Sequence, residues 1–203
     1  MPLRIKLTKK NEKELIDLTS AVLHSGGIII YPTDSSYGLG CIPKFKESVK
    51  KIKRIKKRTK KKSMLVLIDS INSMKKYAEI NSTALKLSRK FHPGQLTIIA
   101  DKKNSIPREV NEKEIAFRIP KNNFCLKLLK KIKEPLISTS LNLSGKKSAY
   151  NSIDLKKFEG KADLVIDAGN LRKAKPSTLF DSRSNKIIRE GAIQGNKILN
   201  FLK

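Results

Sequence analysis

Apolar residues recur three and four positions apart in several segments of the 203-residue chain, which is the spacing that places them on one face of a helix. The segment 11–24 shows this pattern with Leu15, Leu18 and Val22, and two glycines follow it at positions 26 and 27. Helices are predicted at residues 11–24, 47–57, 70–78, 81–90 and 122–133.

Short apolar runs rich in β-branched residues alternate with these helices. The run at 28–31 reads Ile-Ile-Ile-Tyr, and short runs of this kind bounded by turn residues are typical of buried strands. Strands are predicted at residues 28–31, 64–68, 96–100, 114–120, 135–139, 163–169, 176–181 and 186–193. The alternation indicates the α/β class, and the lack of an internal repeat or low-complexity linker favours one domain over residues 1–203.

Small polar side chains follow two of the predicted strands and cluster near a third. Thr33, Ser35 and Ser36 come after the first strand, residues 138–145 form a second cluster, and Ser177 belongs to a third. Ligands of α/β proteins bind beyond the carboxyl ends of strands, where short loops direct hydroxyls and backbone N–H groups toward one crevice. The three clusters together predict a site for a polar, charged small molecule. Each cluster taken singly is also compatible with an ordinary turn.

Basic residues lie at positions where a solvated surface charge is not expected. Arg118 lies in the apolar strand AFRIP and Arg189 in IIREG, while Lys56 and Arg58 end the cationic helix predicted at 47–57. A guanidinium inside a buried strand is costly unless it meets an anion. A ligand anion and a structural Asp or Glu are the two alternatives for each arginine. We expect Lys56 and Arg58 to lie at an exposed helix end.

The formal net charge of +27 comes from 45 Lys and Arg against 18 Asp and Glu. Such an excess is typical of proteins that bind polyanions such as nucleotides, RNA or DNA. Only 9 of the 45 basic residues are Arg, however, and Arg is favoured for bidentate recognition of phosphates and bases. A compositional bias toward Lys, as an AT-rich coding sequence produces, is therefore the alternative origin of most of the charge.

Several function classes lack their sequence signals. No apolar stretch reaches the roughly 18–20 residues of a membrane span, no secretion signal is visible, and Cys41 and Cys125 make neither a disulfide framework nor a zinc site. We expect a soluble, cytoplasmic protein. GxxxxGK[ST] and GxSxG motifs are absent, and His24 and His92 are assigned structural or solvent roles. An enzyme with this sequence would act by positioning and electrostatics, with no covalent nucleophile and no protein-held metal.

Short motifs follow one another along nearly the whole chain. They are YPTDSSYGLGC at 31–41, IKKR at 55–58, HPGQLTII at 92–99, AFRIP at 116–120, STSLNLSG at 138–145, DAG at 167–169, PSTLFD at 176–181 and IIREGAI at 187–193. In this order they resemble the signatures of the threonylcarbamoyl-AMP synthase (TsaC/YrdC) family. Leu141, Ser63 and Gln95 depart from the family, which usually has Ala, Pro and Pro at these positions.

The resemblance implies a fold and an activity. It implies a single YrdC-like catalytic domain with an open, twisted, mixed sheet, flanking helices and a concave basic face. The implied reaction joins L-threonine, bicarbonate and ATP, with Mg²⁺ on the phosphates, into L-threonylcarbamoyl-AMP and releases pyrophosphate. Downstream proteins then transfer the threonylcarbamoyl group to the adenosine next to the anticodon of tRNAs that read ANN codons.

The resemblance also assigns roles to individual residues. The threonine-binding residues would be Thr33, Tyr37, Arg118, Ser138 and Ser177. The ATP-binding residues would be Lys56, Arg58, Ser140, Asn142, Ser148 and Arg189, of which Lys56, Arg58, Ser140 and Asn142 would act in catalysis. Arg118 would pair with the threonine carboxylate or with an ATP phosphate.

A binding module is the alternative to an enzyme. A basic, open α/β sheet can hold double-stranded RNA or tRNA through its backbone and shape, without nucleotide turnover. The low aromatic content, 5%, offers little surface for base stacking, and this alternative does not require three hydroxyl clusters. Weak tRNA binding is also compatible with synthesis.

Overall fold

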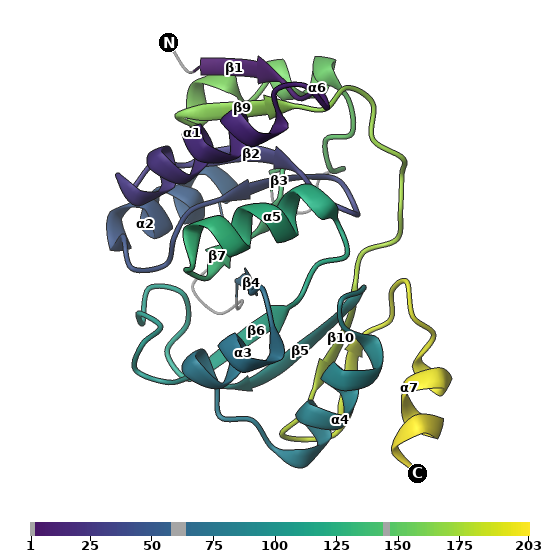
Figure 1. Ribbon diagram of the computed structural model, residues 1–203. Helices are drawn as coiled ribbons and strands as arrows, with labels where there is room; N and C mark the ends of the chain where they lie inside the picture. Colours follow the sequence, from purple (N-terminus) through teal and green to yellow (C-terminus); the bar gives the residue numbers. More distant parts are fainter. Residues whose placement is uncertain (1–2, 58–63, 144–146) are drawn as a thin grey trace.

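The computed structural model describes residues 3–57, 64–143 and 147–203. Figure 1 shows an upper and a lower half, each containing strands with helices packed beside them. The helices are α1 (Glu12–His24), α2 (Lys46–Lys56), α3 (Ile71–Tyr77), α4 (Ser82–Phe91), α5 (Asn123–Ile132), α6 (Ser152–Lys156), α7 (Gly195–Leu202) and the 3₁₀ helix η1 (Glu159–Lys161). The strands are β1 (Leu3–Lys6), β2 (Ile29–Pro32), β3 (Tyr37–Gly40), β4 (Leu65–Leu67), β5 (Leu96–Asp101), β6 (Glu114–Arg118), β7 (Leu136–Ile137), β8 (Thr139–Ser140), β9 (Leu164–Asp167), β10 (Thr178–Asp181) and β11 (Lys186–Arg189).

Within the described residues, the strands form two open sheets. The first sheet has the order β1-β9-β2-β3-β8, and the second has the order β11-β10-β5-β6-β4-β7. Each sheet contains both parallel and antiparallel pairs, such as β1 with β9 and β2 with β3 in the first. The predicted α/β class with open mixed sheets and flanking helices is confirmed, and the predicted strands are shared between two such sheets.

Strand β2 is buried on both faces, which accounts for its continuous run of large apolar residues. Ile30 lies in one core with Leu39 of β3 and Val49 of α2, while Ile29 and Tyr31 lie in a second core. Helices α1 and α5 close the second core and lie side by side across the first sheet (Figure 1). Because successive side chains of a strand alternate between faces, β2 anchors helices on both sides of its sheet.

The core that contains Ile30 continues into the second sheet. It includes Ile98 of β5, Phe117 of β6 and Phe180 of β10, together with Leu87 of α4. The two sheets are thus joined through a continuous apolar interior. In Figure 1, the segment between β9 and β10 runs along one side of the molecule from the upper half to the lower.

The chain passes from one sheet to the other at Ser138. Ile137 of β7 pairs with β4 in the second sheet, and Thr139 of β8 pairs with β3 in the first. The Ser138 N–H donates to the Leu65 carbonyl oxygen at 2.8 Å, which holds the crossing against β4. The strand predicted at 135–139 is therefore divided, and its hydroxyl-bearing end lies where the sheets meet.

The predicted helices correspond to α1 through α5. Ser70, Asn81 and Asn122 precede α3, α4 and α5, and each side chain accepts a hydrogen bond from the N–H three residues later. Such caps satisfy N–H groups that have no partner within the helix. None of the helices described here has the length and apolar composition needed to cross a bilayer.

Elements β1, β3, α6 and α7 were not predicted. Strand β3 is the YGLG segment, whose glycines are more typical of a loop. A Cβ atom on Gly40 would lie 2.5 Å from the Ile137 carbonyl oxygen, so glycine is needed where β3 approaches the crossing at Ser138. Strand β1 is short and carries Arg4 and Lys6, and its pairing with the distant strand β9 decides its conformation.

Candidate active site

Two adjoining cavities lie where the loop after β2, the crossing at Ser138 and the end of β6 meet. The first cavity, of about 60 Å³, and the second, of about 250 Å³, share the wall residues Ser35, Leu65, Arg118, Ser138 and Ser140. Thr33, Asp34, Ser36, Tyr37, Gly38 and Leu67 also line the first cavity. Thr97, Ala116, Thr139, Pro176, Ser177, Leu179 and Arg189 also line the second. We call the two cavities together the central site.

Arg118 ends β6 with 4% of its side chain exposed. Its Nε donates to the Gly94 carbonyl oxygen at 2.7 Å, and its Nη2 forms an ion pair with Asp34 Oδ2. These partners replace the water that a buried guanidinium loses. Of the two partners considered for Arg118, the structure contains the protein carboxylate, Asp34. Binding of a ligand carboxylate by Arg118 stays a prediction. Asp34 was not among the predicted site residues, although an acid directly after the Thr33 hydroxyl was a signal that could have indicated it.

The Thr33 hydroxyl organises the loop that carries Asp34. Its Oγ1 accepts hydrogen bonds from the N–H groups of Ser35 at 3.2 Å and Ser36 at 3.3 Å, and it donates to the Ser36 carbonyl oxygen at 2.7 Å. Hydroxyl bonds of this kind stabilise tight turns. Thr33 lines the first cavity, and its hydroxyl also supports the turn between β2 and β3.

Lys56 reaches the loop after β8 from the last turn of α2. Its Nζ donates to the Ser140 carbonyl oxygen at 2.5 Å and to Asn142 Oδ1, to which Ser140 Oγ also donates at 2.8 Å. Three predicted residues are thereby brought together. The prediction of an exposed helix end is wrong for Lys56, which is 4% exposed because it packs against this loop. Arg58, which was predicted to bind ATP together with Lys56, lies outside the described residues.

Ser177 and Arg189 form another wall of the second cavity. The hydroxyls of Ser177 and Thr97 are hydrogen-bonded at 2.7 Å, and Arg189 Nη2 donates to the Ser177 carbonyl oxygen at 2.7 Å. Burial lowers the pKa of Arg189, which nevertheless stays charged at neutral pH. Among the residues described, no Asp or Glu pairs with Arg189, so this exposed cation on the wall of the second cavity is suited to binding an anion.

Tyr37 lines the first cavity but directs its hydroxyl elsewhere. The hydroxyl donates to the Gly169 carbonyl oxygen at 2.8 Å and accepts from the Ala168 N–H at 2.9 Å. Burial raises the pKa of Tyr37, so the phenol is neutral at physiological pH. Tyr37 therefore ties the turn after β9 to the wall of the first cavity.

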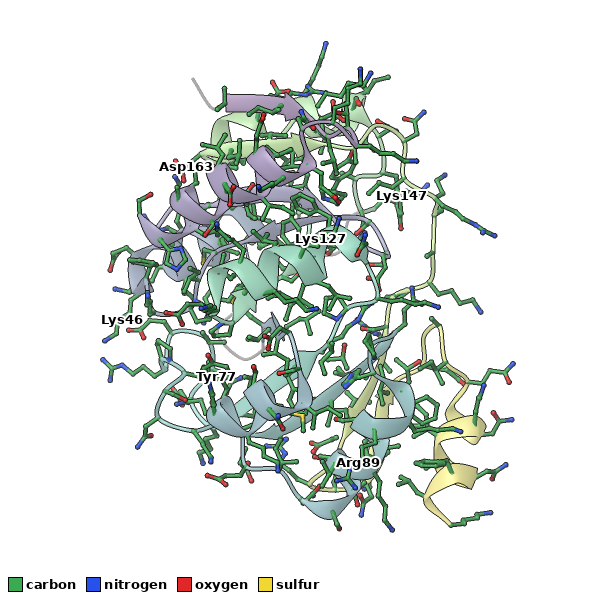
Figure 2. All side chains as sticks on the ribbon, viewed as in Figure 1. Lys46, Tyr77, Arg89, Lys127, Lys147 and Asp163 are labelled. Atoms are coloured by element: carbon green, nitrogen blue, oxygen red, sulfur yellow. The ribbon has the colours of Figure 1, made fainter. Side chains whose placement is uncertain are left out.

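Asn142 and Ser148 line a third cavity, of about 920 Å³, which Asn142 connects to the central site through its bond with Ser140. The aromatic residues Tyr150 and Phe158 and the basic residues Lys147, Lys157 and Lys173 also line this cavity. Figure 2 shows Lys147 at the side of the upper half, near the segment that joins β9 to β10. Aromatic walls combined with cationic side chains suit a nucleoside that carries phosphates.

Most of the predicted site residues therefore lie in one region. Those that line the central site are Thr33, Tyr37, Arg118, Ser138, Ser140, Ser177 and Arg189. Lys56 and Asn142 join them through Ser140, and Ser148 joins them through the third cavity. In the part of the chain that the structure describes, no three His, Cys, Asp or Glu side chains are grouped as a metal site would require.

The Sua5/YciO/YrdC family model, which carries the description "Telomere recombination", matches residues 21–191 of the chain. The matched span contains the whole central site. The chain belongs to this family.

Its relatives include named synthases and proteins without an assigned activity. A Methanocaldococcus jannaschii protein, provisionally named a threonylcarbamoyl-AMP synthase, is 36% identical over 197 residues, covering 95% of this chain and 93% of its own. The threonylcarbamoyl-AMP synthase of Neisseria meningitidis is 30% identical over 175 residues, covering 84% of this chain and 92% of its own.

Solved structures of the family have the same fold. P. abyssi Sua5 in complex with L-threonine superposes with a TM-score of 0.89 at 26% identity, over 100% of this chain and 61% of Sua5. E. coli YciO superposes with a TM-score of 0.85 at 28% identity, over 98% of each chain. The chain thus spans less than two thirds of the length of P. abyssi Sua5 and nearly all of E. coli YciO.

Two departures from the usual residues of the family are accommodated in the structure. Leu141 is 1% exposed, and its N–H donates to the Tyr37 carbonyl oxygen at 2.8 Å. Gln95 Nε2 donates to the Asp34 carbonyl oxygen at 3.2 Å, so it supports the loop after β2. The third departure, Ser63, lies outside the described residues.

Proposed function

We propose that this protein is a threonylcarbamoyl-AMP synthase, which makes L-threonylcarbamoyl-AMP and pyrophosphate from L-threonine, bicarbonate and ATP. One observation carries the proposal. The guanidinium groups of Arg118 and Arg189 line the same adjoining cavities as the serine and threonine hydroxyls of the central site. The printed names of relatives and the L-threonine bound to P. abyssi Sua5 support the choice of reaction and amino acid.

The reaction proceeds in two steps. The threonine amine, once it has lost its ammonium proton, adds to the carbon of CO₂ derived from bicarbonate, and the resulting carbamate releases a second proton. A carbamate oxygen then attacks the α-phosphorus of ATP, while the bond to pyrophosphate breaks and leaves its electron pair on the departing oxygen. Both reactants of the second step are anions, so alignment and charge neutralisation are the main tasks of the protein.

The threonine-binding part of the proposal is the first cavity and its border with the second. Arg118 pairs with the threonine carboxylate, and the hydroxyls of Ser138 and Ser177 bind its polar groups. Thr33 and Tyr37 shape the wall. The carbamate formed on the amine then faces the second cavity, where Arg189 neutralises developing phosphate charge.

The ATP-binding part is the region between the second and third cavities. Lys56 and Arg189 bind the triphosphate, Ser140 and Asn142 contact the α-phosphate region, and Ser148 lies beside the nucleoside. Arg58 is assigned to the triphosphate from its motif alone. Mg²⁺ enters with ATP, carried on the phosphate oxygens.

The product serves tRNA modification. Downstream transfer proteins receive the threonylcarbamoyl group and attach it to the adenosine next to the anticodon of tRNAs that read ANN codons. This transfer takes place in the cytoplasm. The high positive charge of the chain allows weak tRNA contact as well.

Pyrophosphate release tests the proposal directly. The purified protein is incubated with ATP, Mg²⁺, bicarbonate and L-threonine, and each component is omitted in turn. We expect pyrophosphate only when threonine and bicarbonate are both present, together with a product of the mass of threonylcarbamoyl-AMP. Equal release with L-serine, or no release with any amino acid, would contradict the assignment.

Double-stranded RNA binding without turnover is the second candidate, and the net charge of +27 favours it. This candidate predicts RNA affinity that falls steeply with salt and no pyrophosphate release under any of the conditions above. The same preparation therefore distinguishes the two functions when it is assayed for pyrophosphate and for tRNA retention at increasing salt.

A further inference from the structure

Asp34, the ion-pair partner of Arg118, has binding capacity that the reaction described above does not use. Resting on the proposed function, we propose that the pair is a clamp for a zwitterionic amino acid. Arg118 binds the α-carboxylate, and Asp34, through Oδ1, binds the α-ammonium group. Asp34 is thereby a substrate-binding residue that selects amino acids over simple carboxylates.

The charges around the central site support this role. Among the described residues that line the first and second cavities, Asp34 is the only carboxylate, whereas Arg118 and Arg189 supply positive charge. An α-amino acid arrives at neutral pH with one negative and one positive group. Its carboxylate finds guanidinium partners, but its ammonium group finds a single opposite charge, at Asp34. Hydroxyl oxygens accept hydrogen bonds more weakly than a carboxylate does.

The geometry of the pair leaves one side of each member available. Asp34 Oδ2 accepts from Arg118 Nη2 and from the Lys121 N–H at 3.3 Å, while Oδ1 has no hydrogen bond within the described residues. Arg118 uses Nε for the Gly94 carbonyl oxygen and Nη2 for Asp34. The side chain of Asp34 is 15% exposed and lines the first cavity. Each member thus holds the other in place without exhausting its own hydrogen-bonding capacity.

The loop keeps the Asp34 carboxylate in position before a ligand arrives. Thr33 Oγ1 closes the turn on one side, and Gln95 Nε2 donates to the Asp34 carbonyl oxygen at 3.2 Å on the other. A carboxylate that is already oriented loses little conformational entropy when it binds a ligand. Gln95, where the family usually has Pro, therefore contributes a hydrogen bond that supports the clamp.

Net charge explains why a pair suits this ligand better than a single arginine. The ion pair and the zwitterion are both neutral overall, so each charge of the ligand meets an opposite charge and no excess charge is buried. A lone Arg118 in a chain of net charge +27 would favour anions of every kind and repel the ammonium group.

In a competing account, Asp34 pairs with Arg118 only while no ligand is bound. In that account a ligand carboxylate displaces Asp34, which turns toward a neighbouring cavity of about 540 Å³ lined by Asp34, Lys90, Lys121 and Lys197. The two accounts predict opposite effects of Asp34→Asn on threonine affinity. Loss of the charge weakens threonine binding in a clamp and strengthens it when Asp34 merely competes.

Calorimetric titration of two ligands tests the clamp. The ligands are L-threonine and 3-hydroxybutanoate, which keeps the carboxylate and hydroxyl but lacks the amine. We expect Asp34→Asn to lower threonine affinity about 10- to 100-fold, the range for losing a hydrogen bond to a charged group, and to leave 3-hydroxybutanoate affinity unchanged or higher. Asn still accepts a hydrogen bond from Arg118 but leaves the buried guanidinium without its opposite charge, so we expect a lower thermal transition, and the titrations are made at a temperature at which the variant is folded.

Asp181→Asn is the matched control. Asp181 is also a carboxylate paired with an arginine, Arg183, and 11% of its side chain is exposed, but it lies outside the central site. This variant should bind both ligands as the wild type does. The wild-type protein alone provides a second measurement, since the clamp requires threonine to bind at least about tenfold more tightly than 3-hydroxybutanoate.

The remaining outcomes separate this inference from the proposed function. Equal weakening of both ligands by Asp34→Asn assigns Asp34 a structural role, and tighter threonine binding assigns it the competing role; each overturns the clamp. Binding of a different α-amino acid that is weakened by Asp34→Asn supports the clamp and removes threonine as the substrate. A wild-type protein that binds no α-amino acid overturns both proposals.

Discussion

At the scale of single residues, Lys56 shows how a surface cation becomes part of a site. Its ammonium group is directed onto the Ser140 carbonyl oxygen and Asn142 Oδ1, and the residue is almost completely buried. Replacing Lys56 by Met removes the donor to the Ser140 carbonyl oxygen and one of the donors to Asn142 Oδ1, and this loss costs about 1–3 kcal/mol of unfolding free energy. We expect pyrophosphate release to fall at least about 100-fold, because the loop and a phosphate-binding charge are both lost.

Lys50→Met on the same helix is the control for that substitution. Lys50 is half exposed and pairs with Glu47, an exposed contact of little energetic value. Its removal should leave both the urea midpoint and pyrophosphate release unchanged. Wild-type turnover in Lys56→Met would show that Lys56 takes no part in the reaction.

At the scale of elements, the close approach of β3 to the crossing at Ser138 decides where the two sheets meet. Gly40 lies opposite the Ile137 carbonyl oxygen, and an added Cβ atom would come within 2.5 Å of it. Gly40→Ala must push β3 away from the crossing and shift both the Thr33 loop and β8. We expect a loss of about 1–3 kcal/mol, measured by urea unfolding, as for other overpacked sites.

Gly160→Ala provides the comparison, because a Cβ atom at Gly160 meets nothing within 4 Å. Its stability should stay within about 0.5 kcal/mol of the wild type, as for other surface substitutions. Equal urea midpoints for Gly40→Ala and Gly160→Ala would mean that the sheets tolerate a wider separation than the structure indicates.

At the scale of the whole molecule, His92 links stability to pH. The ring packs against Phe117, Nε2 donates to the Leu96 carbonyl oxygen at 2.8 Å, and Nδ1 is buried without a hydrogen-bond partner in the described residues. Burial lowers the pKa of His92 to about 4, so the folded protein keeps the imidazole neutral where the unfolded chain protonates it.

Protonation of the unfolded state sets the sign of the effect. Below the ordinary histidine pKa of about 6.5, the unfolded chain binds a proton that the folded protein does not bind until the pH approaches 4. Stability contributed by His92 is therefore complete above pH 6.5 and is lost as the pH falls toward 4, by up to roughly 3 kcal/mol. His92→Gln should flatten the pH dependence of unfolding in this window. An unchanged slope in His92→Gln would contradict the assignment.

The order of residues along the chain was sufficient to predict the local features of this protein. Helical spacing and β-branched runs predicted α1 through α5 and most strands, because these patterns reflect contacts within a few residues. The motifs indicated the family, and the hydroxyl clusters after strands marked most of the central site, because loops beyond strand ends are where α/β proteins bind ligands.

Tertiary structure alone decided the features that depend on distant partners. The division into two sheets, the strand conformation of β1 and YGLG, the burial of Lys56 and the pairing of Asp34 with Arg118 each join segments far apart in the sequence. Local periodicity records which face of an element is apolar, but it does not record which other element covers that face. The partner of each buried charge is set only when the two sheets pack together, so the clamp proposed for Asp34 followed from the fold.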